Sequence, residues 1–252
     1  MKKWLLLSVI FIWGCEDHID IYDPMIEEPQ EESLTLPSDP IVWMPFNNNT
    51  EDLSGNELDG ILYEGEYTTC RSLNEYSSLG LDIDDNPRWG EENDRVEIPY
   101  NPLLNVDNLT ISTWINIGPK PGKYANRHYT IASRWSHVLY GTEEEKASYI
   151  FSINKDLNLN FHGITSDATI EYDTWYHVVV SVGEKVKFYV NGNLDTVKER
   201  DNLLLPQTDI DLFLGETSMY NGYWYHLDGK LDDFGFWGRV LTDCEINDLY
   251  NM

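Results

Sequence analysis

Two polar segments at opposite ends of the chain carry side chains that could bind a cation. Residues 47–60 form an oxygen-rich turn, Asn-Asn-Asn-Thr-Glu-Asp-Leu-Ser-Gly-Asn-Glu-Leu-Asp-Gly, which follows an apolar run. The acidic pair Asp232 and Asp233 lies inside another apolar run, which ends at Trp237. Carboxylates seldom occupy the buried span of a strand without a partner. A hard cation that takes roughly six to eight oxygens would be such a partner, and it would tie the first strand of a domain to the last.

The N-terminal residues have the form of a secretory signal. Lys2 and Lys3 precede an apolar run, residues 4–13, which is shorter than the roughly 20 residues that span a bilayer. Residues 12–15, Ile-Trp-Gly-Cys, resemble a bacterial lipobox. We therefore expect residues 1–14 to be a lipoprotein signal peptide and Cys15 to be lipidated, which anchors the protein to a membrane. The alternative is an ordinary cleaved signal that leaves Cys15 lost or unmodified.

The segment after this cysteine, residues 15–39, is predicted to be an acidic tether. It carries nine acidic residues, no Lys or Arg, and three prolines. Such a segment cannot bury enough apolar surface to fold alone. Acids directly after a lipidated cysteine resemble the surface-export signal of Bacteroidetes lipoproteins. We therefore expect an outer-membrane lipoprotein exposed at the cell surface, with a periplasmic or secreted protein as the alternative.

The remaining chain, residues 40–252, has the length of one β-sandwich domain. Without Lys2, Lys3 and the nine tether acids it keeps 15 basic and 35 acidic residues, a net charge near −20. This charge argues against nucleic acid or an anionic membrane surface as a partner of the domain. It is compatible with bound divalent cations, although a solvated acidic surface is the commoner explanation.

Strand-like runs dominate residues 40–252, and many of them alternate or are rich in Val, Ile, Tyr, Trp and Phe. About ten short strands in roughly 210 residues predict an all-β, two-sheet antiparallel sandwich. Asn191-Gly192 predicts a tight hairpin turn, and Thr242 with Glu245 predicts the cap of one short C-terminal helix. The predicted strands are Ile41–Phe46, Arg95–Ile98, Leu109–Ile117, Tyr129–Trp135, Ser148–Ile153, Leu157–His162, Trp175–Val182, Val186–Asn191, Leu212–Leu214 and Leu231–Trp237.

Five segments in this order resemble the laminin-G-like, or concanavalin-A-like lectin/glucanase, jelly roll of bacterial surface proteins. The first is Phe46 followed by Asp-Leu-Ser-Gly-Asn-Glu-Leu-Asp-Gly at 52–60. The others are Arg-Val-Glu-Ile-Pro at 95–99 with Leu-Thr-Ile-Ser-Thr-Trp-Ile at 109–115, the hairpin of residues 174–192, Asp-Leu-Phe-Leu-Gly at 211–215, and residues 229–250. The resemblance covers residue 41 to the end and implies a jelly-roll fold.

In this family one Ca²⁺ commonly sits between the first loop and the acidic pair. Carried over by position, the resemblance implies that Asp52 and Asp233 supply carboxylates, that Asn56 and Asn47 offer amide oxygens, and that carbonyls near Gly60 complete the shell. An all-oxygen set favours Ca²⁺ over zinc. Glycine at 55 and 60 fits because it turns freely through positive φ. The alternative is an Asx-rich turn that satisfies its own backbone, with its acids facing water.

The three cysteines allow one disulfide. If Cys15 is lipidated, Cys70 and Cys244 are the only available pair. A disulfide fits the oxidising compartment of an exported protein. Free buried thiols are the alternative.

The residues needed for hydrolysis are incomplete. The glucanase pattern Glu-x-Asp-x-x-Glu has its nearest match at Glu171-Tyr-Asp173, which lacks the last acid. No Gly-x-Ser-x-Gly turn is present, and His177 lies among valines, where a hydrogen-bonded structural histidine is commoner than a base. We therefore predict that the protein is not an enzyme.

Aromatic residues in predicted loops are the candidate ligand contacts, because sugars are recognised by aromatic faces and a few directed polar groups. The alternative role of these aromatics is packing at a sheet edge. The function predicted from the sequence is a non-catalytic carbohydrate-binding or adhesive surface protein. A protein-interaction or structural module is the alternative, and a glycoside hydrolase of the same fold is a third interpretation. The candidate ligand residues are Trp224, Tyr223, Tyr225, Trp89 and Trp135.

Overall fold

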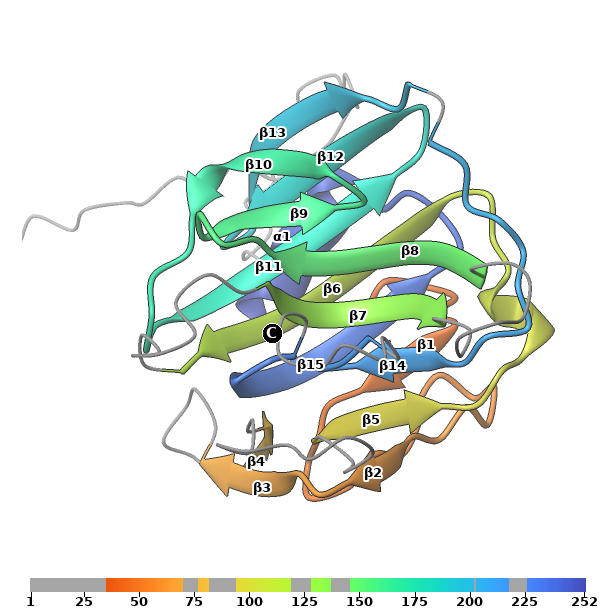
Figure 1. The fold of residues 1–252 in the computed structure, drawn as a ribbon, viewed down its shortest axis with the longest axis vertical. Coiled ribbons are helices and arrows are strands. Elements are labelled where there is room, and N and C mark those ends of the chain that lie inside the picture. Colours follow the sequence, from red (N-terminus) through yellow and green to blue (C-terminus); the bar gives the residue numbers. More distant parts are fainter. Residues whose placement is uncertain are drawn as a thin grey trace, which may run out of the picture. The chain divides into compact units, whose positions relative to one another are not determined.

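Antiparallel strands form two sheets that lie face to face (Figure 1). In spatial order, sheet A contains β13 (Asn193–Glu199), β12 (Lys185–Val190), β11 (Trp175–Val182), β6 (Leu109–Ile117), β15 (Gly229–Trp237), β4 (Ser77–Leu81) and β3 (Glu66–Thr69). A further strand of this sheet, β1 (Val42–Met44), pairs with β15. The computed structural model describes residues 35–69, 77–81, 94–118, 128–136, 146–201, 203–217 and 226–252.

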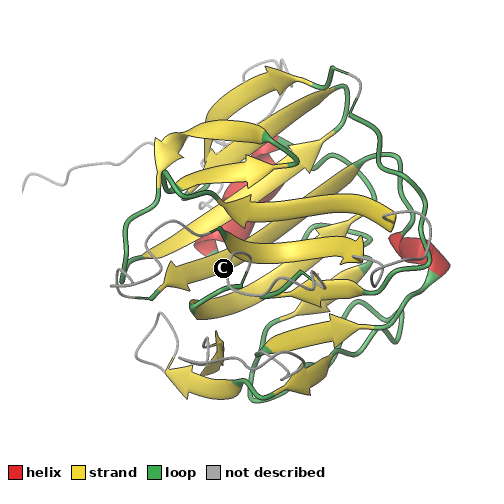
Figure 2. Cartoon of the chain, viewed as in Figure 1, coloured by secondary structure: helices red, strands yellow, loops and turns green. Residues whose placement is uncertain are grey.

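Sheet B covers one face of sheet A and is the nearer layer in Figure 1. In spatial order it contains β10 (Ile164–Thr169), β9 (Asn158–Phe161), β8 (Lys146–Ile153), β7 (Tyr129–Ser136), β14 (Leu212–Leu214), β5 (Arg95–Ile98) and β2 (Ile61–Tyr63). The described helices are a single 3-10 turn, η1 (Pro102–Leu104), and α1 (Asp243–Asn251) (Figure 2). The predicted two-sheet antiparallel sandwich with a C-terminal helix is confirmed.

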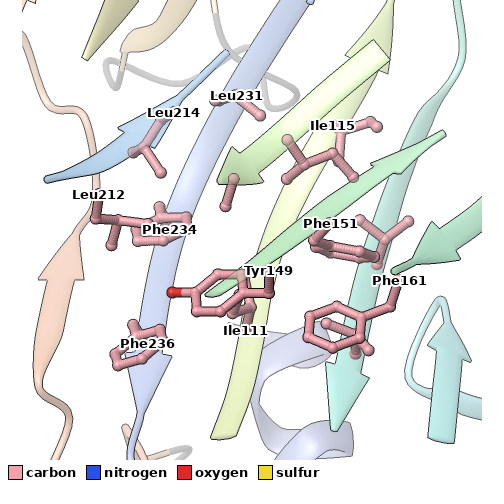
Figure 3. Close-up of a cluster of buried hydrophobic side chains, with 14 of the residues drawn as sticks. Ile111, Ile115, Tyr149, Phe151, Phe161, Leu212, Leu214, Leu231, Phe234 and Phe236 are labelled. Atoms are coloured by element: carbon pink, nitrogen blue, oxygen red, sulfur yellow. The ribbon is translucent and has the colours of Figure 1, made fainter. Parts of the chain in front are cut away.

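The hydrophobic core fills the space between the sheets. Because side chains alternate along a strand, every second residue of each strand points toward the other sheet. Tyr149 and Phe161 of sheet B stack with ring centroids 5.8 Å apart, and Tyr149 also stacks on Phe236 of sheet A. Figure 3 shows these rings beside Ile111 and Phe234, which come from two neighbouring strands of sheet A. Burial of this apolar surface is the main force that holds the two layers together.

A second apolar cluster lies on the outer face of sheet A, where helix α1 packs. Ile246 and Leu249 of the helix join Trp43, Tyr189 and Trp237 in this cluster. Because the helix covers this face, both faces of the central strands of sheet A are buried. In the described part of the chain, no helix is long and apolar enough to cross a membrane.

The predicted cap and hairpin turn are both present. The hydroxyl of Thr242 accepts the N–H of Glu245, and the carboxylate of Glu245 accepts the N–H of Thr242, which is a reciprocal capping box. Between β12 and β13, Asn191 has φ 50° and Gly192 has φ 74°, the two positive values of a tight hairpin turn.

The chain contacts the domain before residue 40, where the tether was expected to end. Leu36 packs against the cluster beneath α1, and the carbonyl of Pro37 accepts the indole N–H of Trp237 at 3.3 Å. Arg239 donates to the carbonyl of Ser38 at 3.0 Å. Residues 36–38 are therefore held by the sandwich. The predicted signal peptide and Cys15 lie outside the described residues.

The C-terminal helix carries a cystine. Cys244, the second residue of α1, is disulfide-bonded. Both other cysteines of the chain, Cys15 and Cys70, lie outside the described residues, so the pairing of Cys70 with Cys244 stays a prediction.

Candidate functional site

The loop predicted to bind calcium is organised around the carboxylate of Asp52. One oxygen accepts the backbone N–H groups of Trp43 and Ser54, at 3.0 and 2.9 Å. The other accepts the Ser54 hydroxyl at 2.7 Å and the N–H of Leu58 at 3.0 Å. Each carboxylate oxygen thus accepts two hydrogen bonds from the protein itself. This is the pattern of an Asx-rich turn that satisfies its own backbone.

Most of the other groups assigned to the loop site also make hydrogen bonds within the protein. The Asn56 amide donates to the carbonyls of Pro40 and Ile41, at 3.1 and 3.0 Å, so carbonyl groups near the loop already accept hydrogen bonds. The carbonyl of Gly60 accepts the Thr50 hydroxyl at 2.6 Å. Asn47 is exposed.

Glycine is required at 55 and 60 for two different reasons. Gly55 has φ 89°, as expected for a turn. Gly60 does not have a positive φ, so that part of the sequence argument was wrong. A Cβ there would lie 2.4 Å from the Val96 side chain, and close approach to β5 therefore explains this glycine.

The acidic pair lies at an irregularity in β15. The register between β15 and β6 shifts between Asp232 and Gly235, and Asp233 has φ 47°. Asp232 is buried and Asp233 is partly exposed. Direct pairing of β1 with β15, Trp43 opposite Gly235, joins the first strand to the last. The loop residues fit the hydrogen-bonded interpretation, and calcium stays a prediction.

The described residues weighed for hydrolysis, Glu171, Asp173 and His177, have different surroundings. Glu171 and Asp173 are exposed in the turn between β10 and β11. His177 is buried, with its Nε2 atom 2.8 Å from the hydroxyl of Ser112. The ring of Tyr250 from α1 lies 6.0 Å from the ring of His177. A histidine that is buried on a helix-covered face and bonded to a serine matches the structural role predicted for it.

Trp135 is the one predicted ligand residue that the structure describes. It lies on β7, and its ring is 6.4 Å from that of His162. Trp89, Tyr223, Trp224 and Tyr225 lie outside the described residues. Whether the five predicted aromatic residues lie together therefore stays a prediction.

A set of ionisable side chains that the sequence analysis did not single out occupies the outer face of sheet B. Val96 and Ile98 of β5 point into the core, so Arg95 and Glu97 point outward. Leu212 and Leu214 of β14 likewise point inward. We call the set Asp211, Glu97, Arg95, Glu216 and His226 the charged row.

Arg95 is the centre of the charged row. Its guanidinium lies 3.7 Å from the Glu97 carboxylate (Nη2 to Oε2) and 3.6 Å from that of Glu216 (Nη1 to Oε2). The guanidinium carbon also lies 4.0 Å from the ring centroid of Tyr63 on β2, a cation–π contact. Two carboxylates and one aromatic face thus hold this cation in a defined place.

The two ends of the row are built differently. Glu97 shares a side-chain hydrogen bond with Asp211, which also accepts the N–H of Tyr100 at 2.6 Å. At the other end, Nδ1 of the buried His226 lies 3.9 Å from Oε1 of Glu216. The row therefore runs from the residue before β14 to the residues after it.

The pKa of the Glu97 carboxyl is raised above its ordinary value. Burial is the main cause, and the negative charge of Asp211 adds to it. Arg95 acts in the opposite direction by favouring the ionised form. Glu97 therefore holds its proton at a higher pH than an exposed glutamate, and in that form it donates a hydrogen bond.

Two of the segments that carry predicted ligand residues join the described chain at this row. Residues 82–93, which contain Trp89, lead directly into Asp94 and Arg95. Residues 218–225, which contain Trp224, are flanked by Thr217 and His226. Trp135 lies toward the other end of the row, because β7 runs antiparallel to β14 with Ser133 opposite Phe213, which carries Trp135 away from Glu216 and toward Asp211. Residues of the charged row are thus adjacent in the sequence to the segments that contain Trp89 and Trp224.

The architecture is that of a lectin-like sandwich, and the sequence assigns it to a family. Residues 90–247 match a family model described as the concanavalin A-like lectin/glucanases superfamily. The match covers more than half of the chain, and the protein belongs to this family. No curated protein sequence matches the chain.

Solved structures share the fold at low sequence identity. The binding domain of Paraclostridial Mosquitocidal Protein 1 is 18% identical with a TM-score of 0.62, over 84% of this chain and 52% of that one. Domain 4 of the extracellular arabinanase of Geobacillus stearothermophilus, in complex with arabinotriose, is 16% identical with a TM-score of 0.57, over 84% and 98%. A Trypanosoma rangeli sialidase is 14% identical with a TM-score of 0.58, over 85% and 33%. This chain thus spans about half of the toxin domain and a third of the sialidase.

Proposed function

We propose that the domain is a non-catalytic carbohydrate-binding module of a cell-surface lipoprotein, and that its glycan binds at the charged row on sheet B. The observation that carries this proposal is Arg95, held between Glu97 and Glu216 on a partly exposed face. Sugar-binding sites use a few fixed polar groups to direct hydrogen bonds to hydroxyls. An arginine held by carboxylates is such a fixed donor, and carboxylates are strong acceptors for hydroxyl groups.

The arabinanase domain supports a carbohydrate ligand. That domain is covered over 98% of its length, and its structure contains arabinotriose. It is therefore a module of the same size and fold that binds a sugar chain. The aromatic segments that adjoin the charged row would supply the apolar faces that sugar rings also need.

The spacing of the carboxyl groups supports binding without hydrolysis. Retaining glycosidases keep their two carboxyl groups roughly 5–5.5 Å apart, and inverting enzymes keep them roughly 6.5–9.5 Å apart. Glu97 and Asp211 instead share a hydrogen bond, so the carboxyl groups of this pair are closer than either class of enzyme uses. We expect no release of reducing sugar from any glycan that the protein binds.

The surface location in this proposal comes from the N-terminal sequence. The lipobox-like residues 12–15 and the acidic segment that follows favour a lipid-anchored protein on a long tether. Cys15→Ala should abolish labelling by a fatty-acid probe in cells, and protease treatment of intact cells should remove the domain. Complete protection from protease would contradict surface exposure.

The direct test of carbohydrate binding is a glycan array followed by titration of the best glycan. Binding should fall strongly in Arg95→Ala and remain in Lys155→Ala, which removes a cation from the exposed turn between β8 and β9. Trp224→Ala tests the aromatic prediction separately. Absence of any glycan signal at millimolar concentration would overturn the proposal.

A protein ligand is the second candidate function. A botulinum neurotoxin binding domain with this fold, 17% identical and with a TM-score of 0.55, was solved in complex with rat synaptotagmin II. This chain covers 51% of that domain, and a protein-binding surface on the shared sandwich is the second part of this proposal. Capture of one defined envelope protein, with no glycan on the array bound, would favour this function.

A further inference from the structure

We infer that the charged row selects uncharged glycans and rejects those whose bound sugars carry a carboxylate or sulfate. The inference rests on the proposed carbohydrate function and names the class of ligand. It concerns the charge balance of the described residues around Arg95, the residue that would have to receive an anionic sugar.

Arg95 has no spare positive charge for an anionic ligand. Its two carboxylate partners lie 3.7 and 3.6 Å away, and its flat face is stacked on Tyr63. An acidic sugar would have to displace Glu97 or Glu216 and leave that carboxylate without its cation. A sugar hydroxyl needs no such displacement, because it can donate to a carboxylate oxygen and accept from a guanidinium N–H.

The other cations on the described strands of sheet B do not belong to the row. Among the described strands of sheet B, the cationic residues are Arg95, Arg134 and Lys146. Arg134 is buried, and each of its five N–H groups is used, in bonds to Leu104, Asn105, Thr208 and Ile210. Lys146 is the first residue of β8, which is separated from β14 by β7.

The carboxylates of the row make its own field negative. Among the described residues of the row, Asp211, Glu97 and Glu216 stand against Arg95 and His226, and the domain as a whole carries a net charge near −20. Such a field repels anionic ligands during approach and in the bound state. Repulsion of this kind is a common source of specificity, since it rejects the wrong ligand without tightening the right one.

The test uses the intact protein and pairs of glycans that differ only in charge. Each pair consists of a neutral oligosaccharide and the same oligosaccharide bearing sialic acid, a uronic acid or sulfate, titrated at 20 mM and 300 mM salt. We expect the charged member to bind at least about tenfold more weakly at low salt, with a smaller difference at high salt because of screening. Equal or tighter binding of the charged member at low salt would overturn the inference alone.

Two variants test the origin of the selectivity. Glu97→Gln with Glu216→Gln frees the charge of Arg95, so binding of the acidic member should improve at least about tenfold relative to its neutral counterpart. Asp156→Asn removes an exposed carboxylate from the β8–β9 turn and should leave selectivity unchanged. Unchanged selectivity in the double variant would contradict the assignment to this row. Failure of both glycans to bind the wild-type protein would overturn the proposed function and this inference with it.

Discussion

The guanidinium of Arg95 and the carboxylate of Glu216 approach to 3.6 Å, which joins β5 to the end of β14 on the outer face of sheet B. The same guanidinium is held by Glu97 on its own strand and by the ring of Tyr63 on β2. Three neighbouring strands thus fix one cation on a sheet face. Such rigid placement is what a binding site built on strands requires.

The raised pKa of Glu97 predicts a defined effect of pH on stability. The folded state binds this proton more tightly than the unfolded state, so the contribution of Glu97 to stability falls as pH rises from about 4.5 through the folded-state pKa. Glu97→Gln removes this dependence. Relative to wild type, the variant should gain stability between pH 4 and pH 7 in urea unfolding. A stability difference that is constant with pH would contradict this.

Glu245 should behave with the opposite sign. Its hydrogen bonds from Arg239 hold the pKa of the carboxyl below its usual value, with the Thr242 cap contributing as well. The stability it contributes is present above the unfolded-state pKa and is lost as pH falls through the folded-state pKa. Glu245→Gln should therefore be destabilising at pH 7 and progressively less so in acid. A loss that grows in acid would refute this assignment.

The cap itself can be tested at neutral pH. Thr242→Ala removes the hydroxyl that accepts the N–H of Glu245, and we expect a loss of about 1 kcal/mol. Thr174→Ala, in an exposed turn, is a matched change and should cost less. An equal loss in both variants would remove the argument for the cap.

Arg134 is predicted to be the most sensitive charged residue of the sandwich. It is 1% exposed, and its guanidinium donates to neutral acceptors that hold residues 104–105 and 208–210 together. Arg134→Met leaves several buried carbonyls without donors and should cost about 3 kcal/mol or more. Lys185→Met, which breaks an exposed ion pair with Glu199, should cost far less. Chemical denaturation measures both, and similar losses would contradict the account.

The role of Asp52 separates the two interpretations of the first loop. Asp52→Asn replaces one acceptor oxygen by a donor that faces N–H or O–H groups, which should cost about 1–3 kcal/mol. If these hydrogen bonds account for the loop, the cost is the same with calcium and with a chelator. If calcium binds instead, the melting temperature of the wild type should fall in chelator. The cost of Asp52→Asn should then be larger with calcium than with chelator.

The sequence predicted those parts of the fold that local pattern determines. The bounds of Leu109–Ile117 and Trp175–Val182 agree with β6 and β11, because long apolar runs with strand periodicity specify a buried strand. β2, β3, β4 and β10 were missed, and β13 was expected only as the strand after the Asn191-Gly192 turn. β2 and β4 show why. Ile61–Tyr63 has three residues, and Ser77–Leu81 contains two serines and a glycine, so neither shows a pattern.

The charged row could be predicted only in part. The alternation in Arg95-Val-Glu97-Ile indicates that Arg95 and Glu97 share a face. The sequence does not show that β5 pairs with β14, which is what brings Glu216 to Arg95. The buried role of Arg134 was not predicted for a similar reason, since the carbonyl groups that it binds belong to loops distant in sequence.

The measurement that tests the central claim most directly is calorimetric titration of the best array glycan into the wild-type protein, Arg95→Ala and Lys155→Ala, each with its melting temperature recorded. Loss of one fixed charge-assisted donor should weaken binding by Arg95→Ala at least about tenfold, while Lys155→Ala binds as wild type does. A stably folded Arg95→Ala that keeps full affinity would show that the glycan does not bind at the charged row.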